Sequence, residues 1–155
     1  MRKVEDIMVR DVVSFKPSDP IHYVAWSLRQ RRISGAPVVE EKKVVGIVSE
    51  RDIMKLIEEH DINLNLILPS PFDVVELPLR MKHEIDEIME VIKKTAATAV
   101  EEIMTKRVIT ISPDATVAEA TKIMGIEMIN RLPVVDKEGK LVGIVTRGDV
   151  IGTLV

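Results

Sequence analysis

The chain contains no cysteine, which excludes disulfide bonds, thiolate nucleophiles and metal sites built from cysteine. Only 3% of its 155 residues are aromatic, while 46% are hydrophobic, including 8 Met. This supply of aliphatic side chains is enough for a folded core and suits strands packed against helices. The composition therefore favours a mixed α/β fold over an aromatic-rich binding groove.

Long apolar runs are also missing. The chain has no uninterrupted stretch of the roughly 18 apolar residues that a membrane helix needs, and Met1 to Asp6 hold no signal-peptide core. The formal net charge of −3 gives no whole-chain attraction for a phosphate backbone. We therefore expect a soluble cytoplasmic protein without a membrane partner, for which nucleic acid is an improbable ligand.

Signatures of catalysis and metal binding are absent from the sequence as well. His22, His60 and His83 are scattered, with no second ligand at a metal-binding spacing. No nucleophile, base and orienting group can be assembled, and neither Gly-x-Gly-x-x-Gly nor Gly-x4-Gly-Lys occurs. We expect no catalytic residue, no metal and no cofactor, and hence no enzyme.

The chain does contain an internal repeat. Val4-Glu5-Asp6-Ile7-Met8 recurs as Val100-Glu101-Glu102-Ile103-Met104, an offset of 96 residues. The same offset places Pro37-Val38-Val39 on Pro133-Val134-Val135. After one extra residue, Gly46-Ile47-Val48-Ser49 matches Gly143-Ile144-Val145-Thr146, and Asp52 matches Asp149. Because order and spacing are kept throughout, the two copies are expected to share one fold.

Each copy shows the pattern of a βαββα unit, preceded by a short amphipathic helix. Short β-branched runs that end before a proline predict a first strand, an apolar face at helical spacing predicts a helix, and two apolar runs around a charged turn predict a hairpin. The predicted elements are strands 12–15 and 108–111, helices around 21–28 and 117–124, hairpin strands 36–40, 44–49, 132–136 and 141–146, and closing helices 52–57 and 149–154.

A unit of little more than 50 residues buries too little surface to be stable alone, so we expect the copies to pair about a pseudo-twofold axis and form two related clefts. The predicted organisation is repeat 1 in 1–60, an acidic linker in 61–98 and repeat 2 in 99–155. In the linker, apolar residues at helical spacing predict an amphipathic helix that packs on the core or on a second subunit: Met81, Ile85, Ile88, Met89 and Ile92.

Two repeats with a Pro-Val-Val strand, a hairpin and Gly-Ile-Val-(Ser/Thr)-x-x-Asp resemble a tandem cystathionine-β-synthase (CBS) domain pair, the Bateman module. The resemblance covers about residues 3–57 and 99–155. It implies reversible binding of AMP, ADP, ATP or another adenosyl ligand such as S-adenosylmethionine. It also implies a regulatory role toward an effector protein or the chain's own oligomer, and a disc-like homodimer.

The ends of the third predicted strands carry the expected ligand chemistry. Ser49 and Thr146 stand where a helix begins, and free N–H groups at a helix start attract phosphate. Asp52 and Asp149, three residues later, can accept hydrogen bonds from both ribose hydroxyls. Gly46 and Gly143 leave room for a ligand or a neighbouring backbone. The alternative is that each hydroxyl and carboxylate merely caps its helix.

The two copies differ beside this motif. Asn130-Arg131-Leu132-Pro133 resembles the His-Arg-Leu-Pro stretch of the gamma subunit of AMP-activated protein kinase, which implies an arginine on phosphate, whereas the first copy has Ser34-Gly35-Ala36-Pro37. We therefore expect the tighter site to use Arg131, Thr146 and Asp149, closed by Ile33 and Ser34. The further expected ligand residues are Ser49, Asp52, Arg51 and Arg147, with Ala36, Leu132, Ile47 and Ile144 lining the purine slot.

Two other functions remain open at this point. The incomplete first cleft and the linker helix also fit a protein-interaction or assembly module that binds no ligand. The cluster Arg29-Gln30-Arg31-Arg32 allows nucleic-acid contact, although a solvated helix end explains it as well.

Overall fold

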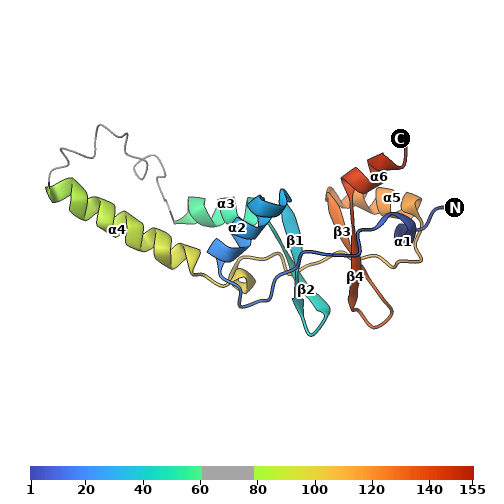
Figure 1. Cartoon of the computed structure of the whole chain (residues 1–155), viewed down its shortest axis with the longest axis horizontal. Helices are drawn as coiled ribbons and strands as arrows, with labels where there is room; N and C mark the ends of the chain where they lie inside the picture. Colours follow the sequence, from blue (N-terminus) through green and yellow to red (C-terminus); the bar gives the residue numbers. More distant parts are fainter. Residues whose placement is uncertain (61–78) are drawn as a thin grey trace.

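The computed structural model describes residues 1–60 and 79–155, so the first part of the predicted linker lies outside the described residues. The predicted α/β fold of two repeats is confirmed. Each repeat holds one two-stranded antiparallel hairpin with a helix before it and a helix after it, and the two hairpins lie side by side (Figure 1). The elements are α1 (Val4–Ile7), α2 (Ile21–Arg31), β1 (Gly35–Glu40), β2 (Lys43–Ser49), α3 (Glu50–Glu59), α4 (Leu79–Ala96), the 3-10 turn η2 (Val100–Glu102), α5 (Val117–Glu127), β3 (Arg131–Val135), β4 (Leu141–Thr146) and α6 (Arg147–Gly152).

The hairpins follow from local turn chemistry. Glu41 and Lys42 both adopt positive φ, at 50° and 68°, which gives the tight two-residue connection whose twist matches antiparallel strands. In the second hairpin the longer turn places Gly139 at φ 82°, a conformation that glycine adopts without strain. The register is equivalent in both, since Gly35 pairs with Ser49 as Arg131 pairs with Thr146.

The predicted first strands, 12–15 and 108–111, are wrong as strands. Each is reduced to a single parallel bridge, Phe15 with Val38 and Ile111 with Val134. The Phe15 N–H donates to the carbonyl oxygen of Pro37 at 3.1 Å, and the Phe15 carbonyl oxygen accepts from the Val39 N–H at 2.8 Å. Pro37 itself has no N–H that could donate to the residues before Phe15. A ladder therefore does not extend along this edge.

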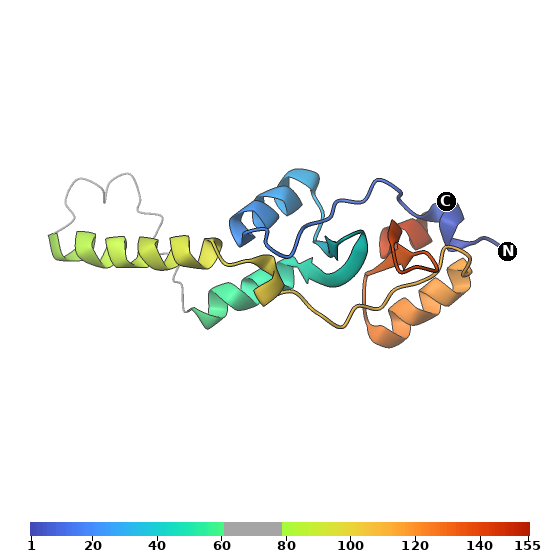
Figure 2. The same cartoon turned by 90° about the horizontal axis from the view of Figure 1, so that it is seen from below.

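The opening segments of the two repeats are exchanged. Val4 is fully buried in the core of repeat 2, and Val100 is fully buried in the core of repeat 1. Figures 1 and 2 both place α1 beside the second repeat, far from α2 and α3. Val9 and Ile144 exchange two backbone hydrogen bonds of 2.9 Å, and Ile47 and Thr105 form the equivalent pair. Each hairpin is thus completed by the chain segment that opens the other repeat.

The side chains of two methionines, Met8 and Met104, hold the exchanged segments by packing against glycines of the opposite hairpins. A Cβ on Gly143 would lie 2.6 Å from the Met8 sulfur, and one on Gly46 would lie 2.8 Å from Cγ of Met104. Of the two expectations for these glycines, close approach of a neighbouring chain segment is the one realised, because the incoming segment takes the space that a ligand would need. The repeated methionine and the repeated glycine are two halves of one contact.

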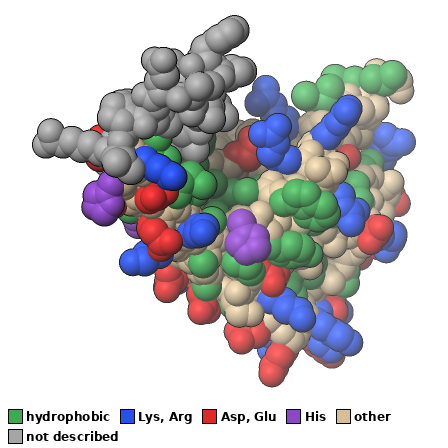
Figure 3. Space-filling model, turned by 60° about the vertical axis from the view of Figure 1, so that its left-hand side comes forward, with side chains coloured by type: hydrophobic (Ala, Val, Ile, Leu, Met, Phe, Trp, Pro, Cys, Tyr) green, Lys and Arg blue, Asp and Glu red, His purple; other side chains and the backbone are tan. Residues whose placement is uncertain are grey.

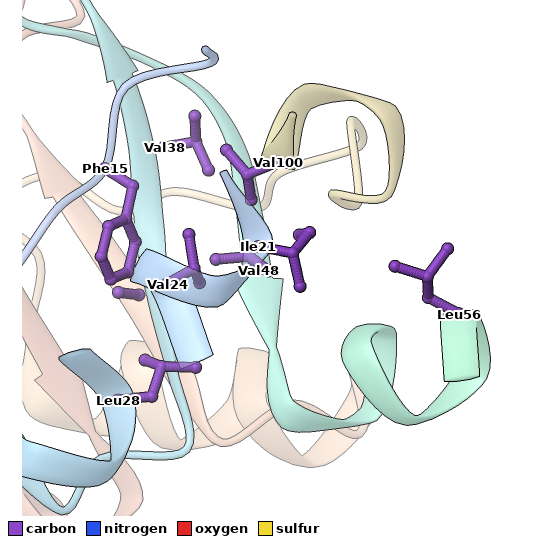
Figure 4. Packing of buried hydrophobic residues seen from close by; sticks show 9 residues of the cluster. Phe15, Ile21, Val24, Leu28, Val38, Val48, Leu56 and Val100 are labelled. Carbon is purple, nitrogen blue, oxygen red and sulfur yellow. The ribbon is translucent and has the colours of Figure 1, made fainter. Parts of the chain in front are cut away.

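The core of repeat 1 is aliphatic apart from Phe15. Val24, Val38, Val48 and Val100 converge between helix and hairpin (Figure 4). The members of the equivalent core in repeat 2 are Val4, Met8, Ile111, Ala120, Met124, Leu132, Val134 and Val145.

The amphipathic linker helix is present as α4, but it does not lie along the core. It projects from the body of the molecule, and only the C-terminal end of α4 lies close to α2 (Figures 1 and 2). Ile85, Ile88 and Ile92 on its apolar face are half-buried, and Met89 is 40% exposed. Within the described residues this stripe does not pack along the two-repeat core, and the alternative, that it packs on a second subunit, stays a prediction.

The exchange yields a stability prediction. Val100→Ala removes two fully buried methyl groups from repeat 1 and leaves a cavity, so the free energy of unfolding should fall by about 2 kcal/mol. Val91→Ala makes the same change at a side chain that is 40% exposed and should alter stability by less than about 0.5 kcal/mol. Urea denaturation followed by circular dichroism measures both, and equal losses would contradict the exchanged core.

Candidate functional site

Two clefts open where the repeats meet, with volumes of about 430 and 440 Å³. The first cleft combines the end of β2 and start of α3 with the α5–β3 connection and the segment after η2. The second combines the end of β4 and start of α6 with the α2–β1 connection and the segment after α1. Each cleft therefore needs both repeats, and the two are related by the internal repeat.

Aliphatic side chains line one side of each cleft. Val108, Ile109 and Ile129 line the first, and Val12, Val13 and Ile33, at the same positions less 96, line the second. Ile47 faces the first group and Ile144 the second. A flat apolar ring fits against such a wall, because branched aliphatic side chains present a continuous surface.

The strand-to-helix turns are closed by reciprocal caps. The N–H of Ser49 donates to Oδ2 of Asp52 at 2.9 Å, and the N–H of Asp52 donates to Oγ of Ser49 at 3.4 Å. The equivalent bonds between Thr146 and Asp149 are 2.8 and 3.2 Å. The capping alternative is therefore realised in both repeats.

Each cap uses only one of the two carboxylate oxygens of its aspartate. Both the backbone N–H and the hydroxyl of the capping residue donate to Oδ2, and among the described residues nothing donates to Oδ1 of Asp52 or Asp149. Both side chains are half-buried. An ionised carboxylate whose orientation is fixed by a cap still has an oxygen that can accept a hydroxyl proton.

The helix starts offer fewer free donors than the sequence predicts. The first N–H of α3, on Glu50, donates to the carbonyl oxygen of Ser34 at 2.9 Å, and that of α6, on Arg147, donates to Asn130 at 2.8 Å. The caps also use the N–H groups of Asp52 and Asp149. In the first turn of each helix this leaves one N–H group, on Arg51 or Gly148, for which the described residues provide no acceptor. Phosphate recognition then falls mainly to guanidinium groups.

Arg131 occupies the junction of the clefts. Its side chain lines both of them, donates a hydrogen bond from Nη2 to Oγ of Ser34 and covers Gly35. Burial lowers the pKa of Arg131 from the usual arginine value, and the nearby Glu50 carboxylate partly offsets this effect. The guanidinium is thus a partly desolvated cation that a dianion would stabilise.

Most of the predicted site residues lie in these clefts. The first is lined by Ser34, Ile47, Ser49, Arg51, Asp52 and Arg131. The second is lined by Ile33, Ser34, Arg131, Ile144, Thr146 and Arg147, whereas Asp149 lies behind its cap and not on the wall itself. Ala36 and Leu132 are buried in the two cores, because the alternation of a strand turns them away from the side that Gly35 and Arg131 occupy. Their assignment to the purine slot is therefore corrected.

Several lining residues were missed from the sequence. Arg107 and Glu50 line the first cleft, and Asp11 and Arg32 line the second. Arg32 belongs to the basic cluster considered for nucleic acid, but its φ of 53° at the end of α2 turns the chain into the cleft. The sequence could have identified these residues only in part. The offset of 96 shows that Arg107 and Asp11 are equivalent, but only the exchange of the opening segments shows that each lies in a cleft.

Residues 4–59 and 100–155 match the CBS domain family. The chain belongs to this family. The uncharacterized protein MJ1426 of Methanocaldococcus jannaschii is 48% identical over 153 residues, which cover 98% of this chain and 90% of the relative.

Two solved CBS structures also share the fold. CBSX2 of Arabidopsis thaliana, solved in complex with AMP, superposes with a TM-score of 0.71 at 25% identity and covers 99% of this chain and 96% of its own. The CBS pair of protein MJ0100, solved with 5'-methylthioadenosine and S-adenosyl-L-methionine, gives a TM-score of 0.68 at 24% identity over 99% and 96% of the two chains. CBS pairs of this architecture thus include proteins crystallised with adenosyl ligands. Within residues 1–60 and 79–155 no helix has the length and apolarity to cross a membrane.

The caps can be tested for their contribution to stability. Thr146→Ala removes the acceptor for the Asp149 N–H and should lower the free energy of unfolding by about 1 kcal/mol. The matched control is Thr121→Ala, on the exposed middle of α5, where the hydroxyl bonds only to the Val117 carbonyl and alanine suits the helix better. Chemical denaturation should rank Thr146→Ala below the natural chain and Thr121→Ala level with it or above; the reverse order would contradict a stabilising cap.

Proposed function

We propose that this CBS pair is a regulatory sensor that binds an adenine nucleotide reversibly at the junction of its repeats. The observation that supports it most directly is the capped carboxylate whose Oδ1 accepts no bond from a described residue, present once in each repeat. The first cleft places an aliphatic wall and the Arg131 guanidinium around Asp52, and the second has the same kind of wall and the same guanidinium, with Asp149 behind the Thr146 cap. A nucleotide consists of an apolar ring, a sugar with vicinal hydroxyls, and phosphate. The aliphatic wall suits the ring, the carboxylate suits the hydroxyls and the guanidinium suits the phosphate.

The proposed pose follows from these positions. In the first cleft the purine packs between Ile47 and the wall of Val108 and Ile109, and the ribose hydroxyls bond to Asp52. The phosphate is directed to Arg131, with Arg51 at the rim. In the second cleft Ile144 and Arg147 take the equivalent roles. The ribose hydroxyls reach Asp149, which is not on the cleft wall, past the Thr146 cap.

Regulation is proposed to pass through the contact between repeats. Arg131 of repeat 2 bonds to Ser34 of repeat 1, so a phosphate that draws the guanidinium into a cleft changes a bond across the junction. A ligand shifts a conformational equilibrium by its different affinity for the two states. The receiver of that shift is an effector protein or a second copy of the chain.

Titration calorimetry with AMP, ADP, ATP and S-adenosylmethionine tests the proposal. Asp52→Asn and Asp149→Asn each keep an oxygen for the cap but replace an acceptor with a donor, so each should weaken nucleotide binding in its own cleft by about tenfold. The matched control is Glu119→Gln in the Thr116 cap of α5, outside both clefts, which should leave affinity unchanged. Absence of heat and of a thermal shift with all four ligands would overturn the sensor proposal.

A second role, self-association, is supported by apolar side chains on the helices of repeat 2. Ile126 is 68% exposed, Met128 89%, Ile151 53% and Leu154 87%, on and beside α5 and α6. We propose that these residues form the contact with a second copy, together with Trp26 on α2 and Met54 on α3, which are 60% and 63% exposed on the corresponding helices of repeat 1. Figure 3, which views another face, shows acidic and basic side chains interspersed, and such a surface gives no single-sign field for nucleic acid.

Light scattering during gel filtration tests self-association. Ile126→Glu places a charge in the proposed contact and should convert dimer to monomer at micromolar concentration. Met89→Glu makes the same change on the projecting helix α4 and should leave the dimer intact. A chain that is monomeric without substitution would overturn the proposed contact, and dissociation by Met89→Glu alone would assign the contact to α4.

A further inference from the structure

The two clefts are not separate, because they share a wall. Ser34, Asn130 and Arg131 line both of them. Of these three side chains only that of Arg131 carries a charge. A phosphate group entering either cleft therefore meets the same guanidinium.

The internal repeat would supply two such arginines if it were perfect, but the structure has space for one. At an offset of 96, Arg131 corresponds to Gly35, and each residue pairs with the capping residue at the end of its hairpin. A Cβ on Gly35 would clash with Nη1 of Arg131 and lie 2.8 Å from the Val48 carbonyl oxygen. The absence of a side chain at position 35 is what allows the guanidinium to reach the junction.

The other arginines of the clefts are placed differently. Arg51 and Arg107 line the first cleft only, and Arg32 and Arg147 line the second only. All four are exposed, and solvent and salt screen exposed charges, so they attract a nucleotide more than they fix its phosphate. Arg131 alone is half-buried and held by a bond across the junction.

We propose that Arg131 is the shared phosphate ligand of both clefts, so that a chain holds one phosphorylated adenosyl ligand at a time although it has two clefts. This inference rests on the proposed nucleotide binding. One guanidinium carries a single positive charge, so a second dianion at the junction meets the negative charge of the first with no further buried cation among the described residues to offset it. A phosphate-free nucleoside needs no guanidinium, so it can occupy the remaining cleft.

Calorimetry with AMP and with adenosine tests this coupling on the full chain. AMP should bind with one strong event, the second being at least about tenfold weaker, within the range of ordinary allosteric coupling. The AMP-loaded chain should bind adenosine within about twofold of the affinity of the free chain. Strong binding of two AMP molecules with equal affinity would overturn the shared ligand.

Variants separate competition from two clefts of unequal strength. Of Asp52→Asn and Asp149→Asn, the one that weakens the strong AMP event releases Arg131 to the other cleft. That cleft should then bind AMP at least about tenfold more tightly than the natural chain binds its second AMP. Independent clefts would keep the second affinity unchanged, and this result would overturn the proposal without requiring any change at Arg131.

Arg131→Gln should weaken AMP in both clefts and abolish the difference between the first and second events, while adenosine binding persists. Arg29→Gln, the same change on an exposed residue of α2 outside both clefts, should change neither. If adenosine and AMP both fail to bind the natural chain, nucleotide binding itself is refuted. If both bind but Arg131→Gln affects AMP in one cleft only, nucleotide binding stands and the shared phosphate ligand is refuted.

Discussion

The exchange of opening segments is the constraint on which the rest of the molecule depends. A two-stranded hairpin with two helices buries too little apolar surface to be stable alone. Here Val100 completes the core around β1 and β2, and Val4 completes the core around β3 and β4. Because each repeat needs a piece of the other, the repeats are held in one relative position, and the clefts between them are structural features of the folded pair.

The features that the two repeats share and the position at which they differ have different origins in this chain. The caps, the aliphatic walls and the left-handed residues Arg32 and Met128, with φ of 53° and 54°, follow from the repeat and occur twice. The junction lies near the pseudo-twofold axis, where equivalent side chains would collide. Arg131 therefore excludes any side chain at Gly35, and the chain is asymmetric at the point where a phosphate charge would be recognised.

The repeat could be predicted because its nearly constant offset, which joins Ser49 to Thr146, can be read directly from the sequence. The hairpins and helices could be predicted because each depends on local residue spacing. The errors arise where contacts are not local. The sequence left open whether Gly46 makes room for a ligand or for a neighbouring backbone, because nothing near it in the sequence reveals that Met104 fills its space. Leu132 was assigned to a cleft because the side of a strand that faces the core depends on the partner segment. That Arg131 reaches both clefts follows only from the positions of both repeats.

Under the two proposals, a shared arginine changes what the chain would sense. If each cleft had its own phosphate ligand, occupancy of one would be indifferent to the nucleotide in the other, and the chain would respond to total nucleotide. With one guanidinium between them, phosphorylated ligands compete even when they prefer different clefts. A phosphate in either cleft would draw the Arg131 side chain toward that cleft and break its hydrogen bond to Ser34. Two nucleotides that draw the side chain in opposite directions would then favour opposite conformational states. Under the proposals, such a junction would report the ratio of two ligands, because each would oppose the effect of the other.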